Sequence, residues 1–114
     1  MNQQQITVDG YLGAMAGQGA RDIVAERARQ IEVEGWSPEH DDVQRIGELA
    51  AAAACYCHPE PWMDDTKGVP FSWPWQRRWW KPTTRRRDLV KAGALILAEI
   101  ERLDRLERKA LVNE

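Results

Sequence analysis

The sequence predicts an all-α fold, a small bundle of about three helices with an ordered loop rich in tryptophan and proline before the last helix. Apolar residues recur at helical spacing over residues 20–34, 38–56 and 84–110. Five of the six prolines and five of the six tryptophans fall between these last two stretches, in residues 57–82. With 114 residues the chain has the length of one domain. We therefore expect an N-terminal arm over residues 1–19 and a single α-helical domain over residues 20–114.

The predicted arm mixes glutamine, glycine and isolated apolar residues without a sustained period. A chain terminus of this kind is ordered only where it docks on the domain. The expected docking side chains are Ile6, Val8, Tyr11 and Leu12.

The first predicted helix covers residues 20–34, where Val24, Ala28 and Ile31 share one face and Gly35 follows as a stop signal. A second helix is predicted from Pro38 to Tyr56. Ser37 is suited to cap it, and acidic residues in its first turns suit the helix dipole. Its expected apolar face consists of Val43, Ile46, Ala50 and Ala53.

The run of alanines near the end of the second predicted helix allows another helix to approach closely. We expect its partner to be the last helix, capped by Thr83 or Thr84 and packed antiparallel to it. The predicted apolar stripe of the last helix is Leu89, Ala92, Ile96, Ile100, Leu103 and Leu106, widened by Val90, Ala94 and Leu97. Proline and tryptophan make both helix and regular strand unfavourable in the loop between them.

Composition narrows the classes of protein that the chain can belong to. No run reaches the ~20 apolar residues of a membrane span, and the first residues lack the features of a signal peptide, so a cytoplasmic protein is expected. A net charge of −2 argues against binding to duplex DNA. With 30% charged residues the core should be thin, which favours a homo-oligomer. The two cysteines, Cys55 and Cys57, are poorly spaced for a disulfide within one helix and should be reduced.

Acidic side chains supply one candidate site. Asp41, Asp42, Glu48 and Glu26 offer carboxylate oxygens of the kind that Mg²⁺ prefers. Glu48 directly precedes the alanine-rich segment, so it should lie near the core. The alternative is that these acids occupy solvated helix faces and first turns, where they only interact favourably with the helix dipole.

Cationic and aromatic side chains supply a second candidate site at the start of the last helix. Clustered arginines at the positive end of a helix dipole attract an anion, and tryptophan faces can stack a nucleobase. The alternative is that the tryptophans fill the core while the cations stack on them or pair with the acidic first half of the chain. The candidate nucleotide- or anion-binding residues are Arg78, Trp79, Trp80, Lys81, Arg85, Arg86 and Arg87.

Two stretches resemble the MazG-like proteins of phages and prophages. The first reads Ala-Glu-Arg-Ala-Arg-Gln over residues 25–30, followed by Glu34-Gly35-Trp36 and His40, and the second covers residues 87–105. The resemblance implies an all-α nucleotide pyrophosphohydrolase that cleaves nucleoside triphosphates with Mg²⁺ held by paired acids. Carried onto this chain, it implies Glu48, Asp88 and Glu26 as catalytic residues and Glu48, Asp88, Asp41 and Asp42 as metal ligands.

The acidic pattern of that resemblance is only partly present, because Ala51 and Ala52 stand one turn after Glu48 and Arg85 stands one turn before Asp88. We therefore expect a phage-type protein of the host-cell cytoplasm that binds a nucleotide and hydrolyses it if the metal site is complete. The alternative is a non-catalytic protein that sequesters a nucleotide signal or inhibits a host defence protein. A third hypothesis is that the protein is a purely structural oligomer.

Overall fold

The computed structural model describes residues 7–13, 17–61, 63–64 and 68–112, and within them the protein is predominantly helical, as predicted. The elements in chain order are α1 (Val8–Gly13), α2 (Gln18–Glu32), α3 (Pro38–Asp42), α4 (Glu48–Cys57), β1 (Met63–Asp64), β2 (Val69–Pro70), the 3₁₀ turn η2 (Arg77–Trp79) and α5 (Arg85–Val112). The two short strands form an antiparallel hairpin within the loop. No helix of the described residues is long and apolar enough to cross a membrane.

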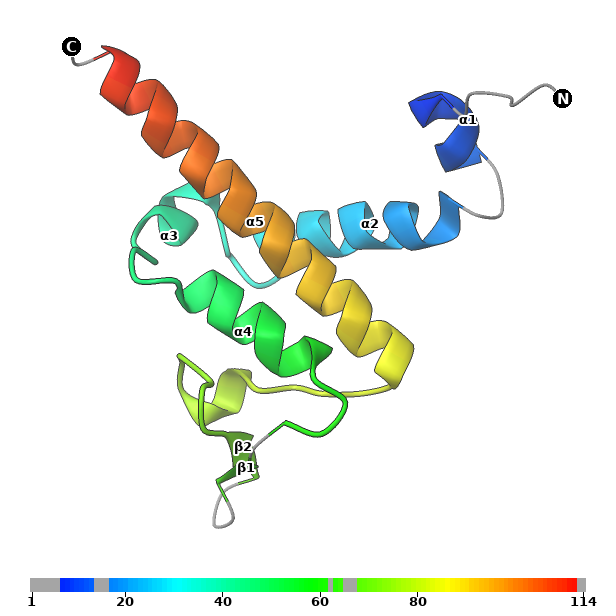
Figure 1. Ribbon diagram of the computed structural model, residues 1–114, viewed down its shortest axis with the longest axis vertical. Helices are drawn as coiled ribbons and strands as arrows, with labels where there is room; N and C mark the ends of the chain where they lie inside the picture. Colours follow the sequence, from blue (N-terminus) through cyan, green and yellow to red (C-terminus); the bar gives the residue numbers. More distant parts are fainter. Residues whose placement is uncertain (1–6, 14–16, 62, 65–67, 113–114) are drawn as a thin grey trace, which may run out of the picture.

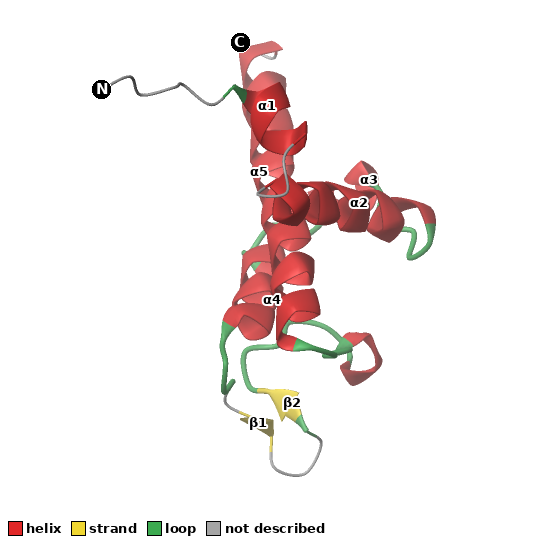
Figure 2. Cartoon of the chain, turned by 90° about the vertical axis from the view of Figure 1, so that its right-hand side faces the viewer, coloured by secondary structure: helices red, strands yellow, loops and turns green. Residues whose placement is uncertain are grey.

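Helix α5 is the axis around which the other elements are arranged (Figure 1). Helix α4 lies antiparallel against its first half, and α2 crosses it near the middle, as both views show (Figures 1 and 2). The crossing is close at Gly93, where a Cβ atom would lie 2.7 Å from the Ile23 Cδ1 atom. The hairpin and the tryptophan-rich loop lie beneath α4.

Small side chains form the interface between α4 and α5. Ala52, Ala92 and Ala98 are at most 1% exposed and belong to one buried cluster, in which Leu49 and Leu95 fill the remaining space. The expected close antiparallel pair is therefore present, because alanines let the two helix backbones approach and the leucines supply apolar area.

The predicted helix over Pro38–Tyr56 is wrong in its middle, because the chain leaves α3 after Asp42 and begins α4 only at Glu48. Gly47 adopts a left-handed conformation with φ of 85°, and the Glu48 carboxylate accepts a hydrogen bond from the Ile46 N–H at 2.7 Å, which closes the turn. Ile46 is consequently 89% exposed. Val43 is exposed as well, so neither belongs to a buried apolar face.

The predicted apolar stripes of the first and last helices are also mostly wrong. Helix α5 buries its small side, including Ala92, Ala94 and Ala98, while its large side chains Leu89, Ile96, Ile100, Leu103 and Leu106 stay exposed. The alanine face of α4 selects that small side, because bulky residues would hold the helices apart. Self-association stays a prediction, and this exposed row is the surface on which it would act.

Helix α2 reverses the expected pattern most clearly. Its apolar residues Val24 and Ile31 are exposed, whereas Glu26, Arg27 and Gln30 are buried. In the arm, Val8 and Tyr11 are exposed and Leu12 is half-buried, so the first two are not docking points. Ile6, the remaining expected docking point, lies outside the described residues.

The contact between α4 and α5 predicts effects of different size for the same substitution at two neighbouring alanines. Ala53→Leu should lower the free energy of unfolding by about 1 to 3 kcal/mol, because added methylenes overpack a close helix contact. Ala54→Leu, on the exposed side of the same helix, should change it by less than about 0.5 kcal/mol. Urea unfolding measures both, and equal effects would show that the two helices are not tightly packed at Ala53.

Candidate functional site

The tryptophans of the loop cover the thin core rather than project freely into solvent. Trp73 is buried, and its ring meets Tyr56 edge-on with centroids 5.6 Å apart. Trp80 lies 4.7 Å from Tyr56, and Trp79 meets Trp36 at 6.1 Å. The alternative in which tryptophans fill the core therefore holds for most of this set, although Trp62 lies outside the described residues.

A pocket of about 390 Å³ opens between α2, the end of the tryptophan loop and α5. We call it the cation pocket. Four cations, two carboxylates and three aromatic rings line it, together with Gln30, Thr83 and Leu95. The charged and aromatic lining residues are Glu26, Arg29, Glu34, Trp36, Tyr56, Trp79, Lys81, Arg87 and Lys91.

Glu26 lies at the centre of the charged wall and is only 2% exposed. Arg29 donates to both of its carboxylate oxygens at 2.8 and 2.9 Å, Gln30 donates at 3.2 Å, and Arg87 reaches it from α5. Burial alone would raise the pKa of Glu26, but the hydrogen bonds and charges of Arg29 and Arg87 outweigh it and lower that pKa. Glu26 is therefore an ionised carboxylate that ties α2 to α5.

Lys81 and Lys91 face the pocket from its other side. The Lys81 N–H donates to the Tyr56 hydroxyl at 3.1 Å, and the Lys91 Nζ atom donates to the Lys81 carbonyl at 2.5 Å. Burial lowers the pKa of Lys91, with only partial compensation by Asp88 at 3.9 Å. The Lys81 side chain is exposed and lies 5.5 Å from the centroid of the Trp79 ring.

The predicted anion-binding residues separate into two groups. Lys81, Arg87 and Trp79 line the cation pocket, as does the expected catalytic residue Glu26. The others lie outside it: Arg78 stacks on Trp79, Trp80 packs on Tyr56, Arg86 pairs with Asp22 at 2.8 Å, and Arg85 is exposed without an ion pair to another described residue. Among the described residues, Arg86 is therefore the one arginine of this second group that pairs with an acid of α2.

The sequence reasoning missed part of the lining. Arg29, Gln30 and Trp36 belong to stretches quoted for the family resemblance, and Tyr56 was expected only as the end of a helix. Lys91 lies in the basic stretch that was expected to attract phosphates. The order Glu26, Arg29, Gln30 on one helix is the signal that would have found Arg29 and Gln30, since neighbouring polar groups on one helix face need polar partners when buried. Tyr56 carries no distinctive sequence signal.

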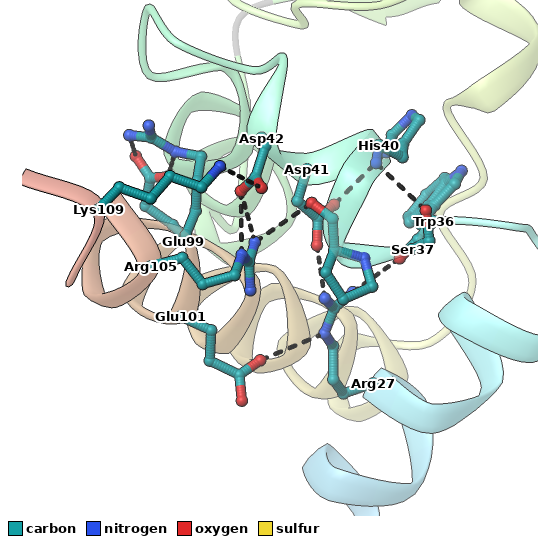
Figure 3. Close-up of polar contacts among 12 residues, drawn as sticks. Arg27, Trp36, Ser37, His40, Asp41, Asp42, Glu99, Glu101, Arg105 and Lys109 are labelled. Atoms are coloured by element: carbon teal, nitrogen blue, oxygen red, sulfur yellow. Dashed lines mark hydrogen bonds and ion pairs between the residues drawn. The ribbon is translucent and has the colours of Figure 1, made fainter. Parts of the chain in front are cut away.

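The acids Asp41 and Asp42 are ion-paired (Figure 3). Asp41 is buried and accepts from Arg27 at 2.5 Å, while the Arg27 Nε atom lies 3.6 Å from Glu101. Asp42 accepts from Arg105 at 2.8 Å, and this hydrogen bond lowers its pKa. Their oxygens hold α3 against α2 and α5 rather than face the cation pocket.

Glu48 and Asp88 are not brought together within one chain. Glu48 begins α4, whereas Asp88 lies near Tyr56, toward the other end of that helix. Glu48 and Tyr56 are about 12 Å apart along the helix axis, because an α-helix rises about 1.5 Å per residue. Each carboxylate caps a backbone N–H, that of Ile46 for Glu48 and that of Thr83 for Asp88. Among the described residues no group of three or more His, Cys, Asp or Glu is arranged to hold a metal ion.

Comparison with known proteins gives no relative: no protein family model, curated protein or solved structure matches the chain. The MazG-like resemblance therefore stays a prediction. The site is assigned from its own geometry.

A second hollow of about 360 Å³ lies across the wall formed by Trp36 and Trp79. Its lining is His40, Gln44, Pro74, Trp75, Gln76 and the two shared tryptophans, with neither lysine nor arginine. An anionic ligand is consequently attracted to the cation pocket and not to this aromatic hollow.

The charged wall makes a pH-dependent prediction. Glu26→Gln should lower the free energy of unfolding at neutral pH by about 1 to 3 kcal/mol, because two arginines lose an ionised partner. Since the folded-state pKa of Glu26 lies below its ordinary value of 4.5, this contribution is complete above 4.5 and is lost as the pH falls through the folded-state pKa. Urea unfolding of both proteins across that range measures it.

Glu34→Gln serves as the matched control, because Glu34 makes a single contact with Arg29 at 3.1 Å and is less buried. It should cost less than about 1 kcal/mol. A Glu26→Gln penalty that persists unchanged in acid would show that the charge of Glu26 is not what stabilises the fold.

Proposed function

We propose that the protein binds a nucleotide, or a small molecule that likewise carries phosphate and an aromatic ring, in the cation pocket. One observation carries the proposal: four cationic side chains and only two carboxylates share a pocket with three aromatic rings. Such a combination of excess positive charge and stacking surface matches the two chemical parts of a nucleotide.

The phosphate is expected beside Lys81 and Lys91. Arg29 and Arg87 are already bonded to Glu26, whereas Lys81 has no carboxylate within ion-pair distance among the described residues. Lys91 is held in a partly buried position where burial disfavours its charge. An anion at this place compensates both lysines, and charge-assisted hydrogen bonds to phosphate are the stronger class of hydrogen bond.

The base is expected against Trp36 and Trp79. Their rings line the pocket and are kept in place by the remaining aromatic cluster, so little side-chain entropy is lost when a ligand stacks on them. Stacking of one base on an aromatic ring contributes about 1 to 3 kcal/mol.

Hydrolysis is the second candidate function, and the presence of Glu26 and Glu34 in the same pocket favours it. Both carboxylates are bonded to Arg29. Arg87 and Gln30 also donate to Glu26, so a nucleotide phosphate would have to draw both arginines toward itself before carboxylate oxygens of Glu26 and Glu34 could hold Mg²⁺. The cation would then enter only with the nucleotide. Water would attack the α-phosphorus, pyrophosphate would leave, and a nucleoside monophosphate would remain.

The binding proposal predicts different effects for two cations close in sequence. Lys81→Ala keeps the backbone contacts of residue 81 with Tyr56 and Lys91, but should weaken ATP binding by about 1.5 to 3 kcal/mol. Arg85→Ala, outside the pocket, should leave it nearly unchanged. Titration calorimetry measures both, and binding should weaken with salt because exposed charges are screened beyond about 10 Å at 0.1 M.

An equal loss of affinity in both variants would place the ligand on the arginine cluster instead of in the pocket. If neither ATP nor inorganic triphosphate raises the melting temperature of the protein, the binding proposal fails, because a ligand that prefers the folded state must raise it. An assay of pyrophosphate release from ATP with Mg²⁺ distinguishes hydrolysis from binding alone. Hydrolysis predicts that the wild-type protein releases pyrophosphate and that Glu26→Gln abolishes the release.

A further inference from the structure

One polar atom of the pocket wall has no partner. The Gln30 side chain is only 2% exposed, and its Oε1 atom accepts no hydrogen bond from the described residues. Buried side-chain acceptors are bonded in the large majority of cases, so an exception on a pocket wall indicates a donor that arrives from outside. Arg27 Nε, the other buried atom without a hydrogen bond, has Glu101 at 3.6 Å and lies away from the pocket lining.

The orientation of the Gln30 amide is determined by Glu26. The Nε2 group donates to the Glu26 carboxylate at 3.2 Å, and that carboxylate is ionised and cannot donate in return. Turning the amide over would direct Oε1 at a negative oxygen. Oε1 is therefore fixed as an acceptor and can be satisfied only by an N–H or O–H group.

Trp36 connects this acceptor to the expected place of the base. The backbone N–H of Trp36 donates to the backbone carbonyl of Gln30 at 2.9 Å, which joins the backbone segments that carry these two pocket-lining side chains. Since Gln30 and Trp36 line the same pocket, a base that lies against the Trp36 ring lies beside the helix that carries Gln30, and the lysines line the pocket from the loop and α5.

On the basis of the proposed function, we infer that Gln30 is a specificity-determining residue that selects nucleotides whose base carries an exocyclic amine. Glutamine recognises the amine of adenine through its amide oxygen in other recognition surfaces. Losing such a donor leaves the site's acceptor buried and unpaired, which is the strongest form of discrimination that a binding site can exert.

The test uses pairs of nucleotides that differ only in the amine: ATP with purine riboside triphosphate, and CTP with its analogue lacking the 4-amino group. Titration calorimetry on the wild-type protein should show the amine-bearing member of at least one pair binding about tenfold tighter or more. Gln30→Met, which keeps the length of the side chain and removes the acceptor, should reduce that ratio to about threefold or less.

Gln44→Met is the matched control, because Gln44 Oε1 accepts from Trp75 Nε1 at 2.9 Å outside the cation pocket. It should leave the ratio unchanged. Both substitutions should lower the melting temperature, because each removes one side-chain hydrogen bond, from Trp75 to Gln44 or from Gln30 to Glu26.

Equal affinities within both pairs in the wild-type protein would overturn the inference, whether or not Gln30→Met folds. A preference for the amine that persists in Gln30→Met would overturn it too. Both results leave the proposed function standing, because the nucleotides still bind. If inorganic triphosphate and all four nucleotides fail to bind, the proposed function itself has failed.

Discussion

The ionised carboxylate of Glu26 is the interaction on which the arrangement of α2 depends. Helix α2 exposes its larger apolar side chains Val24 and Ile31, so apolar packing contributes little to its position apart from the contact of Ile23 with Gly93. Ion pairs from Glu26 to Arg87 and from Asp22 to Arg86 hold it on α5 instead. Because removing one partner of a buried ion pair leaves the other uncompensated, this junction is sensitive to single substitutions.

The same junction explains the character of the pocket. Because α2 is attached to α5 by ion pairs and not by apolar packing, charged and polar side chains line the space between the two helices. The thin alanine interface of α4 and α5 supplies little apolar area, and the tryptophan cluster covers what remains. Trp36 and Trp79 thus serve both the core and the pocket wall.

The uneven distribution of charge along the chain also finds its reason in this arrangement. Acidic residues of α2 and α3 meet basic residues of α5 in pairs, among them Arg105 with Asp42 and Arg86 with Asp22, and Arg27 of α2 pairs with Asp41 of α3. These ion pairs hold the three helices together. Lys81 and Lys91 are the cations of the pocket that this pairing leaves least compensated, which is why we propose that a phosphate would bind beside them.

The sequence by itself determined the helical class, a threonine cap on the last helix, the antiparallel approach of α4 and α5, and the aromatic nature of the loop, because these follow from local propensity and from the size of alanine. The structure then chose Thr84 over Thr83 as the cap. Only the tertiary structure decided which face of each helix is buried. Helical periodicity assumes that apolar faces point inward, yet α2 buries Glu26, because arginines from two helices neutralise it, and Gln30, which donates to Glu26. Likewise α5 exposes Leu103 and buries Ala98, because the alanines of α4 bring the two helices close together on that side. The pocket depends on these two departures from the expected burial of α2 and α5. They result from contacts between residues far apart in the chain, which helical periodicity within one segment does not reveal.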